Sequence, residues 1–352
     1  MRTFLPEWAE QEAVLMAFPT ENTDWAYILE EAQLQYLRII DALTKEGINV
    51  VVLCHDVEKT NDLIKGLRKE FISLIRIDYN DTWTRDYGPL TIVKDDCLRA
   101  LDFGFNGWGL KFAADKDNLA NLRMMENFII PKAVYRNERE FVLEGGSVET
   151  DGEGTILTTS KCLCSPNRNG GLTKEKAESM LHQYLGASHV LFLDYGELEG
   201  DDTDSHIDTL ARLAPENIIL FTGCRDIDDP HFEELLKMRA QLTLFRNAEG
   251  EPFNLVELPL PLPIYDEEGN RLPATYANYL VTDKAIFIPT YNQPDNDLLA
   301  MQTIRIAFPD HKIVGVDCTT LIKQHGSLHC ATMQLPKGLL NPIIFECNSG
   351  CQ

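Results

Sequence analysis

The feature that most constrains the fold of this chain is an order of elements that recurs five times: an apolar stripe with helical spacing, then a short apolar run. In the first unit the stripe covers residues 26–47 and ends at Gly47, and the continuous run at 48–55 is typical of a buried strand. The same order returns at 60–70 with 73–79, 173–186 with 189–195, 230–241 with 242–247, and 296–310 with 311–317. This alternation predicts an α/β fold, and its recurrence predicts an internal structural repeat without readable identity between the copies.

Two further segments predict β-hairpins between these units. Residues 141–160 contain two strand-like runs around the turn residues Asp151 to Gly154, and residues 276–291 contain two around Thr282 and Asp283. The proline-rich stretch at 258–270 is expected to be a loop, because strand-like sequence resumes on both sides of it. No low-complexity segment separates two halves of the chain, so we expect residues 1–352 to form a single domain.

The balance of charge limits the partners of the protein. The 55 acidic and 32 basic residues give a formal net charge of −23, which repels phosphate backbones and attracts cations. This favours a small cationic substrate over nucleic acid, although an acidic surface also keeps a protein soluble without any ligand. The apolar runs are too short to span a membrane, and the N-terminal residues lack the apolar stretch of a secretory signal. We expect a mature cytoplasmic protein, and assembly into a homo-oligomer is compatible with the sequence.

The nine cysteines form neither a disulfide pattern nor a zinc pattern. They stand at positions 54, 97, 162, 164, 224, 318, 330, 347 and 351, without a C-x-x-C pair. Their spacing favours a reducing compartment and predicts no metal site and no cofactor. Thiols such as Cys54 and Cys97 lie in apolar runs, where cysteine acts as a small hydrophobic residue. Cys330, in the stretch GSLHCATMQ, belongs with them unless other residues distinguish it.

The segment SHIDTLARL contains a histidine and an acid two residues apart. If this segment is extended, His206 and Asp208 point to the same face and place a base beside a carboxylate. An isolated H-x-D pair is more often a surface feature at the start of a strand. Residues 199–208 are also rich in aspartate, but they lack the glycine pattern of a calcium loop and offer a single histidine for zinc.

Two other segments place acids beside residues of special geometry. DTWTRDYGPL combines Trp83, Arg85 and Asp86, and its simplest interpretation is a turn with Trp83 in the core. LEGGSVE places Glu144 before two glycines, where the chain has no side chains and another group can approach closely. Neither segment is specific alone, because glycines beside an acid are common.

The motifs WTRD, EGG, HID and LHC occur in this order and together supply a thiol, an imidazole and three acids. With this ordered set the chain resembles the guanidino-group-modifying pentein superfamily, and most closely its agmatine deiminase and bacterial peptidylarginine deiminase family. The resemblance extends from LMAFPTENTDW through FNGWG to HCATMQLP, which is nearly the whole chain. It implies a five-bladed α/β propeller of ββαβ modules with pseudo-fivefold symmetry, in agreement with the five recurrences of helix and strand.

The resemblance also implies a mechanism. Cys330 attacks the guanidinium carbon as a thiolate, and His206 protonates the departing ammonia and then activates the water that hydrolyses a thiouronium intermediate. Asp86 and Asp208 hold the planar guanidinium by paired hydrogen bonds, and Glu144 bonds both the substrate and His206. A thiol beside three carboxylates is hard to ionise, so we expect the bound guanidinium and a charged His206 to lower its pKa.

Charge also favours one substrate class. A net charge of −23 favours agmatine, a dication that gives N-carbamoylputrescine and ammonia, and we expect Trp83 or Trp108 to contact its guanidinium or methylene chain. Arginine and peptidylarginine, which give citrulline, are not excluded as substrates, because Arg85, expected among the substrate-binding residues, or Arg168 could bind a carboxylate. An amidinotransferase, a dimethylarginine hydrolase and a polyamine-binding protein without turnover are also compatible with these residues.

Two segments depart from the family pattern. The family has three glycines before x-[IL]-His-Cys, whereas QHGSLHC keeps Gly326 and has Gln324 and His325 at the other two positions. AFPTENTDW lacks the arginine that often follows the proline in agmatine deiminases. Both changes bear on the choice of substrate more than on the type of reaction, because neither touches the five chemical residues.

Overall fold

The structure is a computed structural model that describes residues 2–346. Its strands are Arg2–Phe4 (β1), Gln11–Ala17 (β2), Val50–Cys54 (β3), Ile72–Arg76 (β4), Leu90–Lys94 (β5), Cys97–Gly104 (β6), Tyr135–Val142 (β7), Val148–Thr150 (β8), Thr155–Thr159 (β9), His189–Leu193 (β10), Ala211–Ala214 (β11), Ile218–Thr222 (β12), Asn254–Leu258 (β13), Leu280–Val281 (β14), Ala285–Thr290 (β15), Lys312–Asp317 (β16) and Met333–Pro336 (β17). Its α-helices are Leu29–Lys45 (α1), Val57–Leu63 (α2), Thr84–Tyr87 (α3), Gly107–Leu110 (α4), Ala120–Glu126 (α5), Ser160–Leu163 (α6), Pro166–Asn169 (α7), Lys174–Leu185 (α8), Phe232–Leu242 (α9), Pro294–Ala307 (α10) and Ile343–Glu346 (α11).

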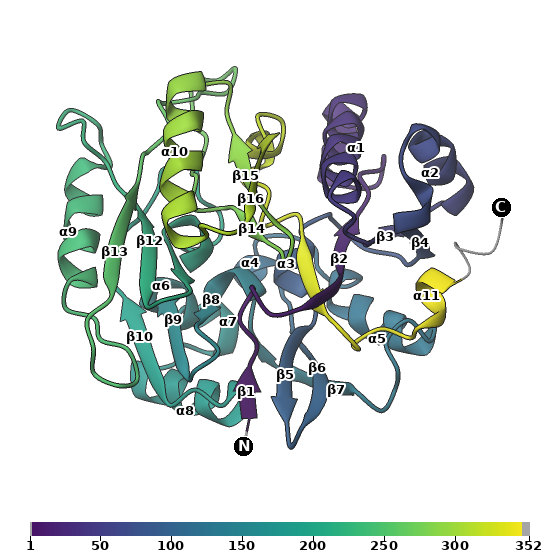
Figure 1. The fold of residues 1–352 in the computed structure, drawn as a ribbon, viewed down its shortest axis with the longest axis horizontal. Coiled ribbons are helices and arrows are strands. Elements are labelled where there is room, and N and C mark those ends of the chain that lie inside the picture. Colours follow the sequence, from purple (N-terminus) through teal and green to yellow (C-terminus); the bar gives the residue numbers. More distant parts are fainter. Residues whose placement is uncertain (1, 347–352) are drawn as a thin grey trace.

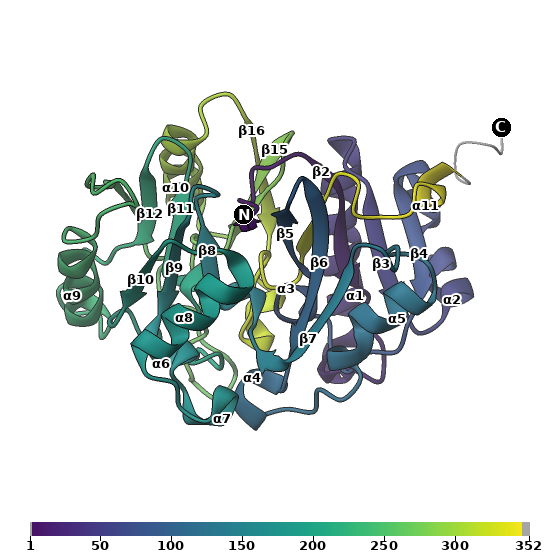
Figure 2. The same ribbon diagram turned by 90° about the horizontal axis from the view of Figure 1, so that it is seen from below.

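These strands form five sheets within the described part of the chain. The strand orders are β1-β5-β6-β7, β10-β9-β8, β11-β12-β13, β14-β15-β16 and β17-β2-β3-β4. Each sheet contains an antiparallel pair and a parallel pair, for example β14 with β15 and β15 with β16. Parallel neighbours need a crossover, which the helices supply. Figure 1 shows α1, α2, α9 and α10 toward the outside of the molecule and the short helix α3 near its middle, and Figure 2 shows the same arrangement from below.

Four of the five predicted helix–strand units are present: α1 with β3, α2 with β4, α8 with β10, and α10 with β16. The first illustrates why, because one face of α1 is buried, with Tyr36, Ile39, Ile40 and Leu43 at helical spacing, while every residue of β3 is buried. Both predicted hairpins also form, with β8 antiparallel to β9 and β14 antiparallel to β15.

The strand predicted in the fourth helix–strand unit does not form. Helix α9 forms, but residues 242–247 complete the end of the helix and the turn after it, and within them Arg246 makes only an isolated bridge to Pro252. The parallel partner of β12 is β13, which begins at Asn254. Leu242 is buried as the last residue of α9 while Leu244 is 74% exposed, so the apolar residues of this run pack as the end of a helix and not as a strand.

The units are also distributed unevenly among the sheets. The predicted units of α1 and α2 both belong to the sheet β17-β2-β3-β4, whereas the sheet β1-β5-β6-β7 uses α5, a short helix that the apolar period did not predict. Residues 120–126 give too few turns for a clear apolar period. The recurrence therefore predicted the alternation of helix and strand but not its assignment to sheets.

Strand β17 places the C-terminal part of the chain against the N-terminal part. It pairs antiparallel with β2, and Met333 lies opposite Leu15. The segment that precedes β17 contains Cys330, so this pairing ties the segment of Cys330 to β2. Within residues 2–346, the helices are all too short or too polar to cross a bilayer.

Candidate active site

Gly146 marks the point where three of the predicted residues meet. A Cβ atom on Gly146 would lie 2.7 Å from Nδ1 of His206, 2.9 Å from Oδ1 of Asp86 and 3.0 Å from Oδ2 of Asp208. These side chains come from α3 and from the turn before β11, and Gly146 lies in the loop that follows β7, so the three segments are far apart in the sequence. A hydrogen atom is the only substituent that fits among them, which explains the second glycine after Glu144.

A tight turn, and not a strand, brings His206 and Asp208 together. The segment is not extended, because residues Ile207–Thr209 form a 3-10 turn and β11 begins only at Ala211. The hydroxyl of Thr209 donates to the His206 carbonyl at 2.9 Å, and the His206 backbone N–H donates to the hydroxyl of Thr203 at 3.0 Å. Such local bonds compete with strand pairing, and an H-x-D pattern carries no sign of them.

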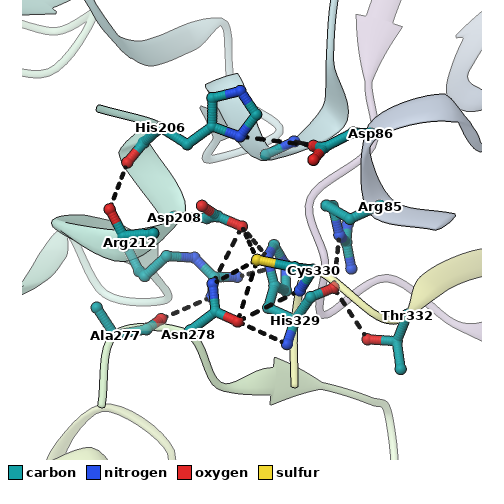
Figure 3. Close-up of polar contacts among 12 residues, drawn as sticks. Arg85, Asp86, His206, Asp208, Arg212, Ala277, Asn278, His329, Cys330 and Thr332 are labelled. Carbon is teal, nitrogen blue, oxygen red and sulfur yellow. Dashed lines mark hydrogen bonds and ion pairs between the residues drawn. The ribbon is translucent and has the colours of Figure 1, made fainter. Parts of the chain in front are cut away.

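Cys330 lies at the centre of the site, as Figure 3 shows, and only 7% of its surface is exposed. Its sulfur lies 3.3 Å from Nδ2 of Asn278 and 3.8 Å from Oδ2 of Asp208. Burial, together with the charges of Asp208 and Asp86, raises the pKa of this thiol well above its ordinary value. Asn278 was not among the predicted site residues, because it is a single polar residue in an apolar segment and belongs to none of the recognised motifs.

His206 is fully buried between two carboxylates. Its Nδ1 lies 3.6 Å from Oδ1 of Asp86, and its Nε2 lies 3.9 Å from Oε2 of Glu144. Neither ring nitrogen has a hydrogen-bond partner among the described residues. Burial opposes a charge on the ring, but Asp86, the sulfur of Cys162 and Glu144 overcome it and hold the His206 pKa well above its ordinary value. The ring is therefore a proton donor at neutral pH.

Glu144 is held by Arg168. Nε of Arg168 lies 2.9 and 2.8 Å from the two carboxylate oxygens, and both side chains are almost fully buried. Burial alone would raise the pKa of Glu144, but His206 and Arg168 lower it below its ordinary value. Arg168 also donates to Asp204 and to the Thr203 carbonyl, so it is saturated and does not offer a free cation to a substrate carboxylate.

Asp86 and Asp208 differ in their hydrogen-bond partners. Asp86 accepts hydrogen bonds from the indole N–H of Trp108 and from the backbone N–H of Gly146, each at 2.9 Å. Burial raises the pKa of Asp86. Asp208 uses Oδ2 to bind His329 and Asn278, while its buried Oδ1 has no partner among the described residues. An unpartnered buried carboxylate oxygen is costly, and a bound cation would satisfy it.

Arg85 does not reach the cavity, which corrects its expected place among the substrate-binding residues. Its guanidinium donates to Glu7 at 3.1 Å and to Gln334 at 2.5 Å, and a second arginine, Arg212, donates to the other oxygen of Glu7 at 2.6 Å. This buried cluster continues to His329, whose Nε2 lies 2.6 Å from Glu7. Arg85 therefore supports the segment around Cys330 from behind.

A cavity of about 170 Å³ leads to Cys330. Its lining consists of Asp24, Asp81, Trp83, Asp86, Trp108, Phe112, Asp202, Thr203, Thr209, Gln324, His325, Gly326 and Cys330. Four of these side chains are aspartates, and none is lysine or arginine. Burial raises the pKa of Asp81 to about 7, so a bound cation would favour its ionised form at neutral pH. The cavity fits a cation with an apolar body.

The two residues that replace family glycines lie in the wall of this cavity. Nδ1 of His325 lies 2.7 Å from the Gly200 carbonyl and joins the loop before Cys330 to the loop before His206. His325 has a φ of +63°, a conformation that glycine adopts more readily than other residues. Gly326 is retained because a Cβ there would lie 2.3 Å from the ring of Trp83.

Replacement of Gly146 by alanine should inactivate the site with a modest effect on the fold. The new methyl group must displace His206, Asp86 or Asp208, and a displacement of about 1 Å costs about 100-fold in rate. We expect kcat/KM for a guanidine substrate to fall at least that far while the circular dichroism spectrum is unchanged. Gly66→Ala is the matched control, because a Cβ there meets nothing within 4 Å. Equal activity of the two variants would contradict the described geometry.

Known proteins resemble this chain over nearly its whole length. The model of the Porphyromonas-type peptidyl-arginine deiminase family matches residues 3–336. A Shewanella sp. (strain MR-4) protein with the provisional name agmatine deiminase is 33% identical, over 94% of this chain and 93% of the relative. The crystal structure of a Porphyromonas gingivalis protein provisionally named arginine deiminase has 43% identity and a TM-score of 0.91, with 97% of this chain and 100% of that chain covered. Agmatine deiminase from C. jejuni, solved with substrate bound, has 37% identity and a TM-score of 0.88, with 96% and 97% covered.

Proposed function

Because the chain belongs to the Porphyromonas-type peptidyl-arginine deiminase family, we propose that it hydrolyses the guanidinium of agmatine to N-carbamoylputrescine and ammonia. Agmatine deiminase relatives support deimination of a guanidino group as the reaction class. The observation that carries the choice of substrate is a cavity that ends at a buried thiol and contains four aspartates without a lysine or arginine. We also propose that the five sheets are the blades of one five-bladed α/β propeller domain.

Two carboxylates hold the guanidinium in this proposal. Asp86 lines the cavity, and the carboxylate of Asp208 lies beside Asp86 at Gly146, with its Oδ1 free of hydrogen bonds among the described residues. A planar guanidinium between two carboxylates makes charge-assisted hydrogen bonds in a fixed orientation. The arrangement brings the substrate carbon next to the Cys330 sulfur, which is itself 3.8 Å from Oδ2 of Asp208. Trp108 orients Asp86 through its indole N–H and also lines the cavity.

The chemistry proceeds in two steps through a covalent intermediate. The Cys330 thiolate forms an S–C bond to the guanidinium carbon, and His206 transfers a proton to the amino group that leaves as ammonia when the C–N bond breaks. His206 then accepts a proton from water as the water oxygen bonds to the carbon of the thiouronium. The C–S bond breaks, the thiolate returns, and the ureido product leaves. Nδ1 of His206 serves in both steps, because it faces Asp86 and Gly146, while Nε2 faces Glu144.

Binding of a guanidinium should lower the pKa of the Cys330 thiol. In the free protein, burial and then Asp208 and Asp86 raise this pKa, so the thiolate fraction grows only at strongly alkaline pH. A cation between the two carboxylates cancels their effect on the sulfur. We expect thiolate absorbance at Cys330, taken as the difference from a Cys330→Ala protein, to appear at lower pH when an unreactive guanidine is bound. An unchanged titration midpoint would contradict activation by substrate.

The cavity favours agmatine over arginine substrates. Arginine carries a carboxylate, and both arginines that were candidates for binding it are engaged, Arg85 with Glu7 and Arg168 with Glu144. The ammonium of agmatine meets instead a cavity wall that contains Asp24, Asp81 and Asp202. The carboxylate of arginine would face these aspartates, and such a contact between like charges costs several kcal/mol of binding free energy. A cost of this order is enough to favour agmatine over arginine.

Ammonia release from a panel of guanidines tests this function. The panel contains agmatine, free arginine, C-terminal and internal peptidylarginine, and a methylated arginine. We expect agmatine to give the highest kcat/KM, at least about 100-fold above that of arginine. A 100-fold ratio requires a difference of only about 3 kcal/mol in free energy. A higher kcat/KM for a peptide substrate than for agmatine would contradict this choice of substrate and indicate peptidylarginine deimination. Binding of agmatine without release of ammonia would support a polyamine-binding protein and contradict catalysis.

A further inference from the structure

Behind the imidazole of His206 lies a second thiol that the reaction does not use. Cys162 belongs to α6, is fully buried, and has its sulfur 3.8 Å from Oε2 of Glu144. That same oxygen lies 3.9 Å from Nε2 of His206. The sulfur, a ring nitrogen of His206 and the carboxylate oxygen all lie within 4.8 Å of one another. We propose that Cys162, His206 and Glu144 form an inhibitory binding site for a thiophilic divalent metal ion such as Zn²⁺.

The geometry of these three atoms suits a tetrahedral metal. Zn–S bonds of about 2.3 Å and Zn–N or Zn–O bonds of about 2.0 Å, at tetrahedral angles, separate neighbouring ligand atoms by about 3.3–3.6 Å. The two separations from Oε2 of Glu144 are 3.8 and 3.9 Å, a few tenths of an ångström above these values, and the third separation, between the sulfur and the ring nitrogen, is at most 4.8 Å. Thiolate, imidazole and carboxylate are the side chains that bind zinc in proteins.

An independent observation points to a ligand at this place. Nε2 of His206 is completely buried and has no hydrogen-bond partner among the described residues. Figure 3 shows one ring nitrogen directed toward Asp86 and the other on the opposite side of the ring. Oε2 of Glu144 faces this nitrogen at 3.9 Å, which is too long for a hydrogen bond, and a metal ion between the two atoms would bond both.

A second cluster of similar composition shows why this one is favoured. Glu7, Glu149 and His329 also lie within reach of a common ion. There Arg212 already occupies the centre, since its guanidinium donates to Glu7 and Glu149 and lies 3.1 Å from Nε2 of His329. A divalent cation would have to displace that buried charge. In the cluster around Cys162, the guanidinium of Arg168 bonds Glu144 but makes no hydrogen bond to Cys162 or His206 among the described residues.

Arg168 leaves the proposed site open. It contacts Glu144 through Nε, a single donor whose hydrogen is shared between the two carboxylate oxygens. A carboxylate has about four acceptor positions, so each oxygen keeps the capacity to bind a metal. No hydrogen bond joins Arg168 to Cys162 or His206 among those of residues 2–346.

The consequence for catalysis rests on the proposed function. A metal on Nε2 occupies the position of the second ring proton, so His206 can no longer form the imidazolium that protonates ammonia. The Cys162 thiol releases its proton when the metal–sulfur bond forms, and the His206 imidazolium releases the proton of Nε2 when the metal–nitrogen bond forms, so metal binding strengthens as the pH rises. The metal lies on the side of the imidazole opposite Asp86, so we expect it to lower kcat through loss of the proton donor.

Binding of Co²⁺ tests the site without any turnover. A tetrahedral Co²⁺–thiolate centre absorbs in the near ultraviolet and has visible bands. We expect one Co²⁺ per chain with these bands in the wild-type protein and in Cys330→Ala, because the nucleophile is not a ligand. Cys162→Ala should lose the bands and at least about 100-fold in affinity. Cys318→Ala removes another buried thiol and serves as the matched control, which should bind as the wild type does. Cys162→Ser replaces the alanine variant if the latter does not fold.

Several outcomes would overturn the proposal. These are bands that survive in Cys162→Ala, bands that disappear in Cys330→Ala, and a wild-type protein without bound Co²⁺. In a turnover assay with Zn²⁺, Cys162→Ala should resist inhibition at least about tenfold better than Cys318→Ala, and equal sensitivity would also overturn it. Failure of agmatine turnover would refute the proposed function and leave the Co²⁺ result intact, so the two failures are distinguishable.

Discussion

Cys330→Ala protein should release no measurable ammonia from agmatine. The thiolate is the group that forms a bond to the guanidinium carbon, and water at neutral pH is a poor substitute for it. Loss of a nucleophile that works with a general base lowers kcat by several orders of magnitude, and we expect a fall of at least about 10³-fold. Binding of agmatine should survive, because Asp86 and Asp208 remain. Ammonia release and calorimetric titration with agmatine measure the two effects separately.

Cys54→Ala and Cys97→Ala are the controls for this variant. Cys54 is a buried residue of β3, so its loss should lower stability by about 1 kcal/mol, whereas Cys97 is exposed and its loss should change little. Both proteins should keep the wild-type kcat/KM. Turnover by Cys330→Ala at a rate within about tenfold of these controls would show that another residue is the nucleophile.

His206→Gln should lower kcat by about 10²–10⁴-fold, the usual contribution of a general acid–base group. Glutamine preserves much of the ring's volume but cannot donate the proton that ammonia needs. The variant should also change the pH profile. Because Asp86, Cys162 and Glu144 overcome burial and raise the His206 pKa, the donor form is present at neutral pH and is lost as the pH rises through that raised pKa. Wild-type kcat/KM should therefore fall at high pH.

The pH profile separates a catalytic from a structural role of His206. In His206→Gln the loss of activity at high pH should disappear, because no imidazolium remains to be deprotonated. The thiolate fraction of Cys330 still rises with pH, so the residual activity should only increase. If the residual activity falls at the same alkaline pH as in the wild type, the fall in the pH profile comes from another titrating group. His206 would then not be the general acid of the mechanism.

The fold was predictable where its signal is local. The period of apolar residues predicted α1 and the strand β3 after it, because one helix face and both sheet faces are buried there. It did not predict α5, which is only seven residues long, and it placed a strand after α9 where none forms. The pairing of β17 with β2 joins segments about 320 residues apart, and the helical and strand periods carry no information on such contacts.

The candidate site was predictable as a set of motifs but not in its geometry. Cys330, His206, Asp86 and Asp208 were named from the order of the motifs, and the structure brings them around Gly146. Arg85 belongs to the same WTRD motif as Asp86, but one turn of helix α3 directs its guanidinium toward Glu7. The contacts of Asn278 and Cys162 come from distant segments without a chemical pattern, so only the folded chain reveals them.

The most direct test of the proposed mechanism is the site of the covalent bond during turnover. Wild-type protein in excess over agmatine is quenched with acid within the first turnover, and the intact mass and digested peptides are analysed. We predict an added mass of agmatine minus ammonia, carried by the peptide that contains Cys330 and absent from Cys330→Ala. The same adduct on a different residue, or product formed by Cys330→Ala at the wild-type rate, would contradict the mechanism.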